Sequence, residues 1–159
     1  MVSNMETTPD PNAARDTLRA AERAAAAPFV DYPPTPVWYP PALGGWFAIL
    51  SAIMVYRPGP AVSVPLLVVL IALVGAFMAW HSRVRGTLPT LTGAPKELHR
   101  PMYGYAAGVV VIVAVVVPVG LFAPPIAAVI ATFVLVTIGI AAYERAYFRA
   151  AQAVKERLA

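Results

Sequence analysis

Residues 102–121 read MYGYAAGVVVIVAVVVPVGL and contain no Asp, Glu, Lys or Arg. Between Val109 and Val117, eight of nine residues are valine or isoleucine, a composition that in a soluble protein is typical of a buried strand. The run also has the roughly 20 residues that a helix needs to cross about 30 Å of hydrocarbon. Because an unpaired strand in lipid would leave its backbone groups without hydrogen-bond partners, the sequence predicts a transmembrane helix here.

Three more apolar runs accompany this one, and none has an acidic or basic residue in its interior. The chain is 59% hydrophobic and 13% charged, with a mean hydropathy of +0.68, whereas soluble domains are about 45–50% apolar and roughly 25% charged. We therefore predict an all-α membrane protein whose residues 42–143 form a four-helix transmembrane bundle of two tandem hairpins. The first run is long enough only if residues 38–41 lie at headgroup depth. The predicted spans are about 42–56, 61–80, 102–121 and 126–143.

A short helix is predicted in the N-terminal segment, residues 1–41. Asp10 is a suitable N-cap, Pro11 fits the first helical position, and Pro28 is expected to end the helix after Ala27. Alanine buries little surface, so a solvated helix is the simpler interpretation, and docking on a partner helix is the alternative. The apolar stripe that would dock consists of Ala14, Leu18, Ala21 and Ala25.

A proline-rich tether leads into the first span, since six of the fourteen residues from Pro28 to Pro41 are proline. Proline fixes φ and removes a donor, so the tether is predicted to be extended and semi-rigid. Trp38 and Tyr39 stand next to the first apolar run and are typical of interfacial anchors. A tether along the membrane surface is therefore favoured over a proline-rich ligand for another protein.

The last predicted helix continues past the membrane as an amphipathic tail, residues 144–159. Charged residues surround its apolar stripe, and basic residues at a membrane surface favour anionic lipid. The tail is expected to lie along the membrane surface or to dock on a partner, with Arg145 and Arg149 among the docking candidates. Its stripe consists of Tyr143, Tyr147, Ala150, Val154 and Leu158.

Basic residues are distributed unequally between the two sides of the predicted spans. The turn after the first span carries only Arg57 and the turn 122–125 carries none, so eleven of the twelve Lys and Arg residues lie on the other side. The positive-inside bias places that side in the cytoplasm. We therefore expect a multi-pass protein of the cytoplasmic (inner) membrane with both termini in the cytoplasm.

No catalytic residue, metal site or cofactor is predicted. The chain has no cysteine, which excludes thiolate ligands and cysteine nucleophiles, and His81 and His99 lack the carboxylate support of a metal site. We expect His81 to contact headgroups. The basic residues form no dense patch, so nucleic acid is not an expected partner. The polar groups within the spans, which hydrogen-bond commonly to their own helix, are Ser51, Ser63, Thr132 and Thr137.

Small residues four positions apart mark the candidate packing surfaces, since they let helix backbones approach closely. Most of them are expected to serve packing inside the bundle, and a surplus ridge would face another protein. The candidates are Gly44, Ala48 and Ala52, then Gly75 and Ala79, then Gly104 and Gly108, and finally Ala127 and Ala131.

The layout resembles small, uncharacterised four-helix membrane proteins of actinobacteria, of a mycobacterial type. The resemblance rests on the Ala- and Arg-rich N-terminal helix, the approach Pro36-Val37-Trp38-Tyr39-Pro40-Pro41, the two hairpins and the basic tail. Some proteins of this kind are accessory subunits of respiratory or lipid-import assemblies, so the resemblance implies a similar role by analogy.

Three functions are consistent with the sequence. The first is a non-catalytic accessory subunit, whose partners are the lipid bilayer and other membrane-protein subunits. The second is a self-associating regulatory or lipid-organising protein, which would form a homodimer through Gly104 and Gly108. The third is a small stand-alone transporter, although an ion pathway usually needs ionisable residues within the spans.

Overall fold

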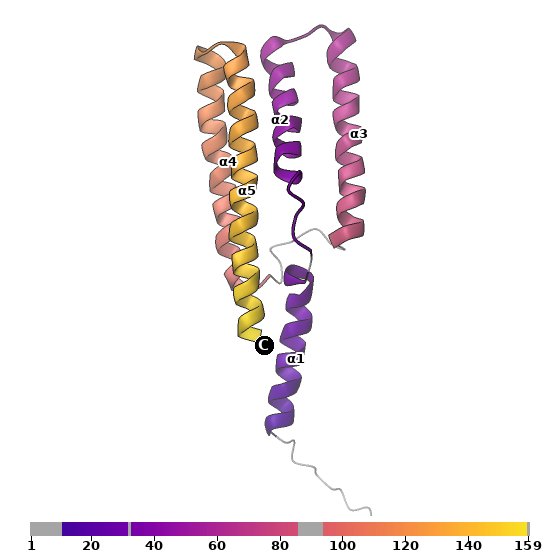
Figure 1. The fold of residues 1–159 in the computed structure, drawn as a ribbon, viewed down its shortest axis with the longest axis vertical. Helices are drawn as coiled ribbons and strands as arrows, with labels where there is room; N and C mark the ends of the chain where they lie inside the picture. Colours follow the sequence, from indigo (N-terminus) through magenta and orange to yellow (C-terminus); the bar gives the residue numbers. More distant parts are fainter. Residues whose placement is uncertain (1–10, 32, 86–93, 159) are drawn as a thin grey trace, which may run out of the picture.

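The structure is a computed structural model that describes residues 11–31, 33–85 and 94–158. These residues form five helices and no strand (Figure 1). Four of the helices are long and apolar enough to cross a membrane, which confirms the all-α fold and the four expected spans. The helices are α1 (Pro11–Val30), α2 (Tyr39–Tyr56), α3 (Pro60–Arg85), α4 (Lys96–Phe122) and α5 (Pro125–Leu158).

Helix α1 is longer than the sequence indicated, because Pro28 does not end it. The helix continues to Val30, with Pro28 inside its last turn. A proline inside a helix removes one backbone hydrogen bond, but Asp31 N still donates to Ala27 O at 2.9 Å. Val30 is buried, so tertiary packing of this turn offsets the lost bond. The expected N-cap, Asp10, lies outside the described residues.

The tether is correspondingly shorter than the expected span from Pro28 to Pro41. Helix α2 begins at Tyr39 and has proline in its first positions, where a missing N–H removes no helical hydrogen bond. Between the helices, Thr35 Oγ1 donates a hydrogen bond to Glu144 Oε2. The short tether is thereby attached to α5.

Helix α5 is the element on which the others pack. It has 34 residues and is therefore about 50 Å long, well beyond the roughly 30 Å of a hydrocarbon core. Helices α1, α2 and α4 all pack against it. The two short links at residues 57–59 and 123–124 lie at one end of the long helices and α1 lies at the other, so the two hairpins point the same way (Figure 1).

Helix α3 stands apart from this group (Figure 1). It follows α2 in the chain, yet the two make few contacts, and α2 packs mainly on α5. Of the four spans, α2, α4 and α5 pack closely together, and α3 makes few contacts with them. Large side chains lie between α2 and α3, among them Trp46, whose Nε1 donates to Leu70 O at 3.1 Å. A tryptophan in this position holds the two backbones apart.

Helix α1 meets the long helices in a small apolar core, which we call the terminal junction. It joins the last turn of α1, the first turn of α4 and the C-terminal half of α5. Phe29, Tyr143, Ala150 and Leu158 pack against it. Its buried residues are Ala26, Val30, Leu98, Tyr147, Ala151 and Val154.

The terminal junction shows how the two helical ends are packed. The apolar stripe of the α5 tail, expected to lie along the membrane surface or to dock on a partner, packs on α1 and α4 of the same chain. Helix α1 is not simply solvated, because its C-terminal end is docked: Ala26 and Val30 are buried, and Arg23 Nε donates to Leu158 O. The predicted stripe, including Leu18 at 65% exposure, remains uncovered. Alanine offers too little area to dock a helix, whereas the last turn adds Phe29 and Val30.

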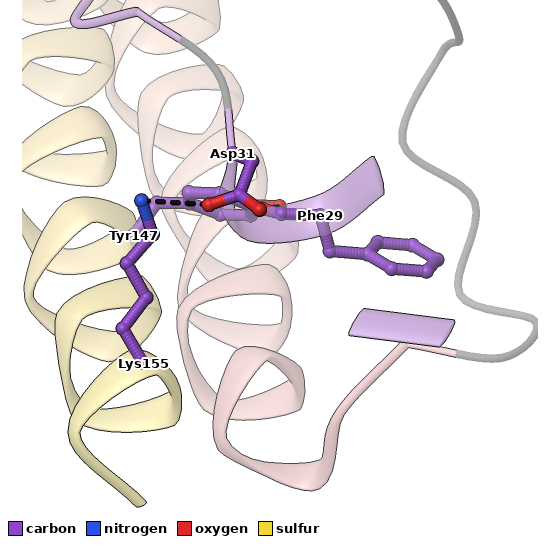
Figure 2. A network of polar contacts seen from close by, with 4 residues as sticks. All are labelled: Phe29, Asp31, Tyr147 and Lys155. Carbon is purple, nitrogen blue, oxygen red and sulfur yellow. Dashed lines mark hydrogen bonds and ion pairs between the residues drawn. The ribbon is translucent and has the colours of Figure 1, made fainter. Parts of the chain in front are cut away.

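Polar contacts at the edge of the terminal junction connect the same elements. Tyr147 Oη donates a hydrogen bond to Phe29 O at 3.0 Å. Figure 2 shows Lys155 reaching from α5 to Asp31, with 2.9 Å between Nζ and Oδ1. Because both side chains of this ion pair are at least half exposed, it contributes little stability. The buried tyrosine is therefore the more important polar contact.

Candidate functional site

The closest helix contact is the seam between α2 and α5. A Cβ built on Gly44 would lie 2.1 Å from Thr137 Oγ1 and 2.9 Å from Phe133 O, so no side chain fits there without movement. One turn further along α2, Ala48 is 8% exposed. Two of the predicted small residues thus lie where helix backbones meet. This agrees with the general use of glycine and alanine in membrane helix packing.

Hydroxyl groups continue this seam on the other side of Ala48. Thr132 Oγ1 donates to Ala128 O at 2.8 Å, and its oxygen lies 3.3 Å from Ser51 Oγ, within hydrogen-bond distance of that hydroxyl. Thr132 is 6% exposed. The hydroxyls therefore join two helices as well as bonding to their own backbone, and the sequence indicated only the second role.

The other predicted ridges do not all reach a neighbouring helix. A Cβ on Gly75, Gly104 or Gly108 would meet no atom within 4 Å. Ala52 is half-buried and Ala79 is exposed. On α5, Ala127 and Ala131 are half-buried, and the buried stripe is shifted by one residue to Ala128, Thr132 and Val136.

Sequence reasoning missed two residues that do mediate close packing on α5. A Cβ on Gly139 would lie 3.3 Å from Ile112 Cδ1 of α4, so this glycine brings α4 and α5 together. Thr137 faces Gly44 across the seam with α2. Gly139 has no small residue four positions away to mark it, and Thr137 is four positions from Ala141 but is not itself a glycine or alanine.

An aromatic cluster joins the start of α2 to the end of α3. The ring centroids of Trp38 and Trp80 are 5.4 Å apart, and those of Tyr39 and Phe77 are 5.6 Å apart and stacked. The two predicted interfacial anchors therefore also hold α3. His81 is 7% exposed and its ring lies 5.7 Å from that of Phe77. It packs within this cluster, whereas the sequence suggested that it would face headgroups.

The predicted docking residues of the tail divide into two groups. Tyr147 is 2% exposed within the terminal junction, and the ring of Tyr143 lies 5.9 Å from it and 5.1 Å from that of Tyr105. These tyrosines pack within the chain. Arg145 and Arg149 are exposed and remain accessible to lipid or to another molecule.

The surface of α3 that faces away from α2 is uncovered. Among the described side chains of α3, only Leu70 and His81 are buried. We call the opposite side the open face of α3. Ile71, at its centre, is 70% exposed. The open face consists of Val64, Val68, Ile71, Gly75 and Ala79, which helical spacing places on one side.

A second feature of the surface is a groove of about 790 Å³ along α4 and α5. Helix α2 contributes Phe47 to it, and the uncovered Gly104 and Gly108 line it on α4. Most of its length is apolar, and its charged residues, Glu97, Arg100 and Arg149, lie at the end nearest the terminal junction. We call it the α4/α5 groove.

Among the described residues, no group of three or more His, Asp or Glu could hold a metal ion. Comparisons with protein-family models, with curated proteins and with solved structures found no match for this chain.

Proposed function

We propose that this chain is a non-catalytic accessory subunit of a larger membrane complex, and that the open face of α3 docks on a partner helix. The observation that carries the proposal is the separation of α3 from the rest of the chain. Its open face offers Gly75 and Ala79, with no atom of the chain within 4 Å of a Cβ on Gly75. Helices associate in lipid mainly through close packing at such small residues.

The side chains of α2 support this assignment because small residues face α5 and aromatic residues face α3. Toward α5, α2 presents Gly44 and Ala48, which bring the backbones together. Toward α3, it presents Trp46 and Tyr39, which keep the backbones apart. The chain thus holds α3 in place without using its small residues, which are then available to another protein.

The orientation that follows from the basic residues belongs to the same proposal. Arg57 stands at the end of the helices that carries the two short links, and the described Lys and Arg residues of α1, α4 and α5 stand at the other. The positive-inside bias would place the second end, with both termini, in the cytoplasm of a bacterial inner membrane. A respiratory or lipid-import assembly is the kind of partner that the resemblance suggests.

The experiment is purification from the native membrane in mild detergent through a C-terminal tag, followed by mass spectrometry. The variant Gly75→Leu/Ala79→Leu adds bulk to the open face. Overpacking of about 1–3 kcal/mol corresponds to an affinity for the partner that is roughly 5- to 150-fold weaker, which should be seen as reduced partner recovery. The matched control is Ala114→Leu, an exposed position on α4, which should leave recovery unchanged.

A photoreactive residue distinguishes direct docking from an indirect effect. Placed at Ile71 on the open face, it should form a defined adduct with the partner, whereas at the buried Val136 it should not. Equal partner recovery from the native chain and the Gly75→Leu/Ala79→Leu variant would contradict the proposal. So would recovery of the chain alone in detergent that preserves other complexes of the same membrane.

A second candidate function is self-association, because Gly104 and Gly108 are also uncovered. In that case the purified chain would be a homodimer without a stoichiometric partner. Gly108→Ile would convert the dimer to a monomer in chemical cross-linking, whereas Gly75→Ile would not. A native chain that is monomeric in mild detergent would exclude this candidate.

A further inference from the structure

The α4/α5 groove has a shape suited to an extended apolar chain. Its lining runs along α4 from Arg100 to Val117, about 25 Å at 1.5 Å per residue. Half of a roughly 30 Å hydrocarbon core is about 15 Å, so the groove is longer than one leaflet is thick. The glycines Gly104, Gly108 and Gly139 remove side-chain bulk along this path.

The charges of the groove are confined to one end. Arg100 and Arg149 both line it and are exposed. Among the described residues, neither arginine forms an ion pair or a side-chain hydrogen bond. The carboxylate of Glu97, at the same end, is paired with Arg157 at 2.8 Å. The groove therefore ends in two arginines that are not paired with a carboxylate among the described residues.

The groups that line the groove follow one another along the helix in the order of their usual depth in a membrane. Tyr105 and Tyr143 line the groove next to the arginines, with their ring centroids 5.1 Å apart, and tyrosine is enriched at the membrane–water interface. From Gly108 onward the α4 side of the lining is apolar. The order along the groove is thus cationic, aromatic and apolar, which matches the order of phosphate, glycerol region and acyl chain in a phospholipid.

We propose that the α4/α5 groove binds one anionic glycerophospholipid. Its phosphate lies at Arg100 and Arg149, where guanidinium groups bond phosphate oxygens in a bidentate manner. One acyl chain lies along α4 and α5 beside the three glycines. This site is separate from the open face of α3, so it stands whether or not the chain is an accessory subunit.

Charge complementarity favours a lipid over a second copy of this chain in the groove. A two-fold symmetric dimer places the same surface of both copies against each other. If the two-fold axis runs along the membrane normal, Arg100 and Arg149 of the two copies meet at the same depth. Like charges would then repel at the contact, whereas a phosphate neutralises them.

The test is native mass spectrometry of the purified full chain, titrated with phosphatidylglycerol or with phosphatidylcholine of the same acyl chains. We expect tighter binding of phosphatidylglycerol. The variant Arg100→Gln/Arg149→Gln should lose that preference by about 30-fold, roughly fivefold for each arginine. The matched control is Arg145→Gln, an exposed arginine on α5 outside the groove, which should retain the preference.

A second pair of variants tests the apolar part of the groove. A Cβ at Gly108 or Gly75 meets no atom within 4 Å, so leucine can replace either glycine without a clash inside the chain. Gly108→Leu fills the groove and should weaken the binding of both lipids equally, whereas Gly75→Leu on α3 should leave the binding of both unchanged.

Three results would overturn the proposal. Equal affinity of the native chain for the two lipids would exclude recognition of the anionic headgroup. If Arg145→Gln reduces the preference for phosphatidylglycerol as much as Arg100→Gln/Arg149→Gln does, the attraction is a diffuse one between basic residues and an anionic lipid. A lipid-free dimer that Gly108→Leu dissociates would assign the groove to a second copy.

Discussion

Replacement of Gly44 by alanine adds one methyl group at the seam between α2 and α5 and should destabilise the packed helices. The new Cβ would stand 2.1 Å from Thr137 Oγ1 and 2.9 Å from Phe133 O. The threonine side chain can rotate, but the carbonyl oxygen belongs to the backbone of α5. The helices themselves must therefore move apart.

The size of the effect follows from the backbone contact. Non-bonded heavy atoms are in ordinary contact at roughly 3.5–4.0 Å, so the contact between the alanine Cβ and Phe133 O alone requires the seam to open by about 0.6 Å. Overpacking of a well-packed interior costs typically about 1–3 kcal/mol. We expect Gly44→Ala to lower the free energy of unfolding by an amount in this range.

The assay is reversible unfolding of the purified chain in mixed micelles, with increasing SDS and tryptophan fluorescence as the signal. Gly75→Ala and Gly108→Ala are matched controls, since a Cβ at either position meets no atom within 4 Å. Alanine is a better helix former than glycine by up to about 1 kcal/mol. The controls should therefore be as stable as the native chain or slightly more stable.

Thr137→Ala provides an internal test of the reasoning. Thr137 Oγ1 is buried without a hydrogen-bond partner among the described residues, so its removal alone should cost little. Combined with Gly44→Ala, it removes the 2.1 Å contact but leaves the one to Phe133 O. The double variant should recover part of the loss, with a coupling energy of about 1 kcal/mol. The seam does not determine stability if Gly44→Ala is as stable as Gly75→Ala. The same conclusion holds if adding Thr137→Ala to Gly44→Ala restores none of the lost free energy of unfolding.

Three further predictions concern the ends of the chain and α3. Tyr147→Phe removes the bond to Phe29 O and should cost about 0.5–1.5 kcal/mol, seen as faster hydrogen exchange in the last turn of α1; unchanged exchange would contradict it. Leu98→Ala, at a fully buried position, should lower the free energy of unfolding by about 2–5 kcal/mol and expose α1 to protease while the spans stay folded. If α1 and the spans become protease-sensitive together, the terminal junction does not unfold separately. Trp46→Phe removes the bond to Leu70 O and should broaden spin-label distances between α2 and α3, and an unchanged distribution would show that the indole does not hold α3.

The existence of the four spans could be predicted because it depends on properties read along the chain. The run from Val109 to Val117 is apolar whatever its neighbours are, and in lipid only a helix satisfies its backbone. The ends of the helices depend on more than hydropathy. Helix α5 passes Tyr143 without interruption and continues to Leu158, because loss of hydropathy marks where a helix leaves the membrane and does not end it.

The docking of the two ends could not be predicted because its partners are far apart in sequence. Tyr147 bonds to Phe29 across 118 positions, and no local pattern relates the two. Pro28 gave a misleading signal for the same reason. Its effect on a helix is local, whereas the burial of Val30 that retains the last turn arises from contact with α5 and α4.

The small-residue ridges show the limit of local patterns more directly. Gly44, Gly75 and Gly108 each begin or end a pair of small residues four positions apart, and the spacing does not distinguish them. Only Gly44 faces another helix of the chain within 4 Å. The spacing predicts that a helix can be approached closely, and which helix approaches it depends on the tertiary structure.

The arrangement of side chains around α2 explains why this helix packs closely on α5 and only loosely on α3. Gly44 and Ala48 allow α2 to lie directly on α5, and because α5 also carries Gly139 against α4, these three helices form one packed unit. Trp46 faces α3 and fills the space that a closer helix would need. A change from aromatic to small residues on that face of α2 would let α3 approach, but α3 would need matching small residues at Leu70. The separation of α3 from α2 therefore follows from the order of small and aromatic residues in α2 together with the large Leu70 on the facing side of α3.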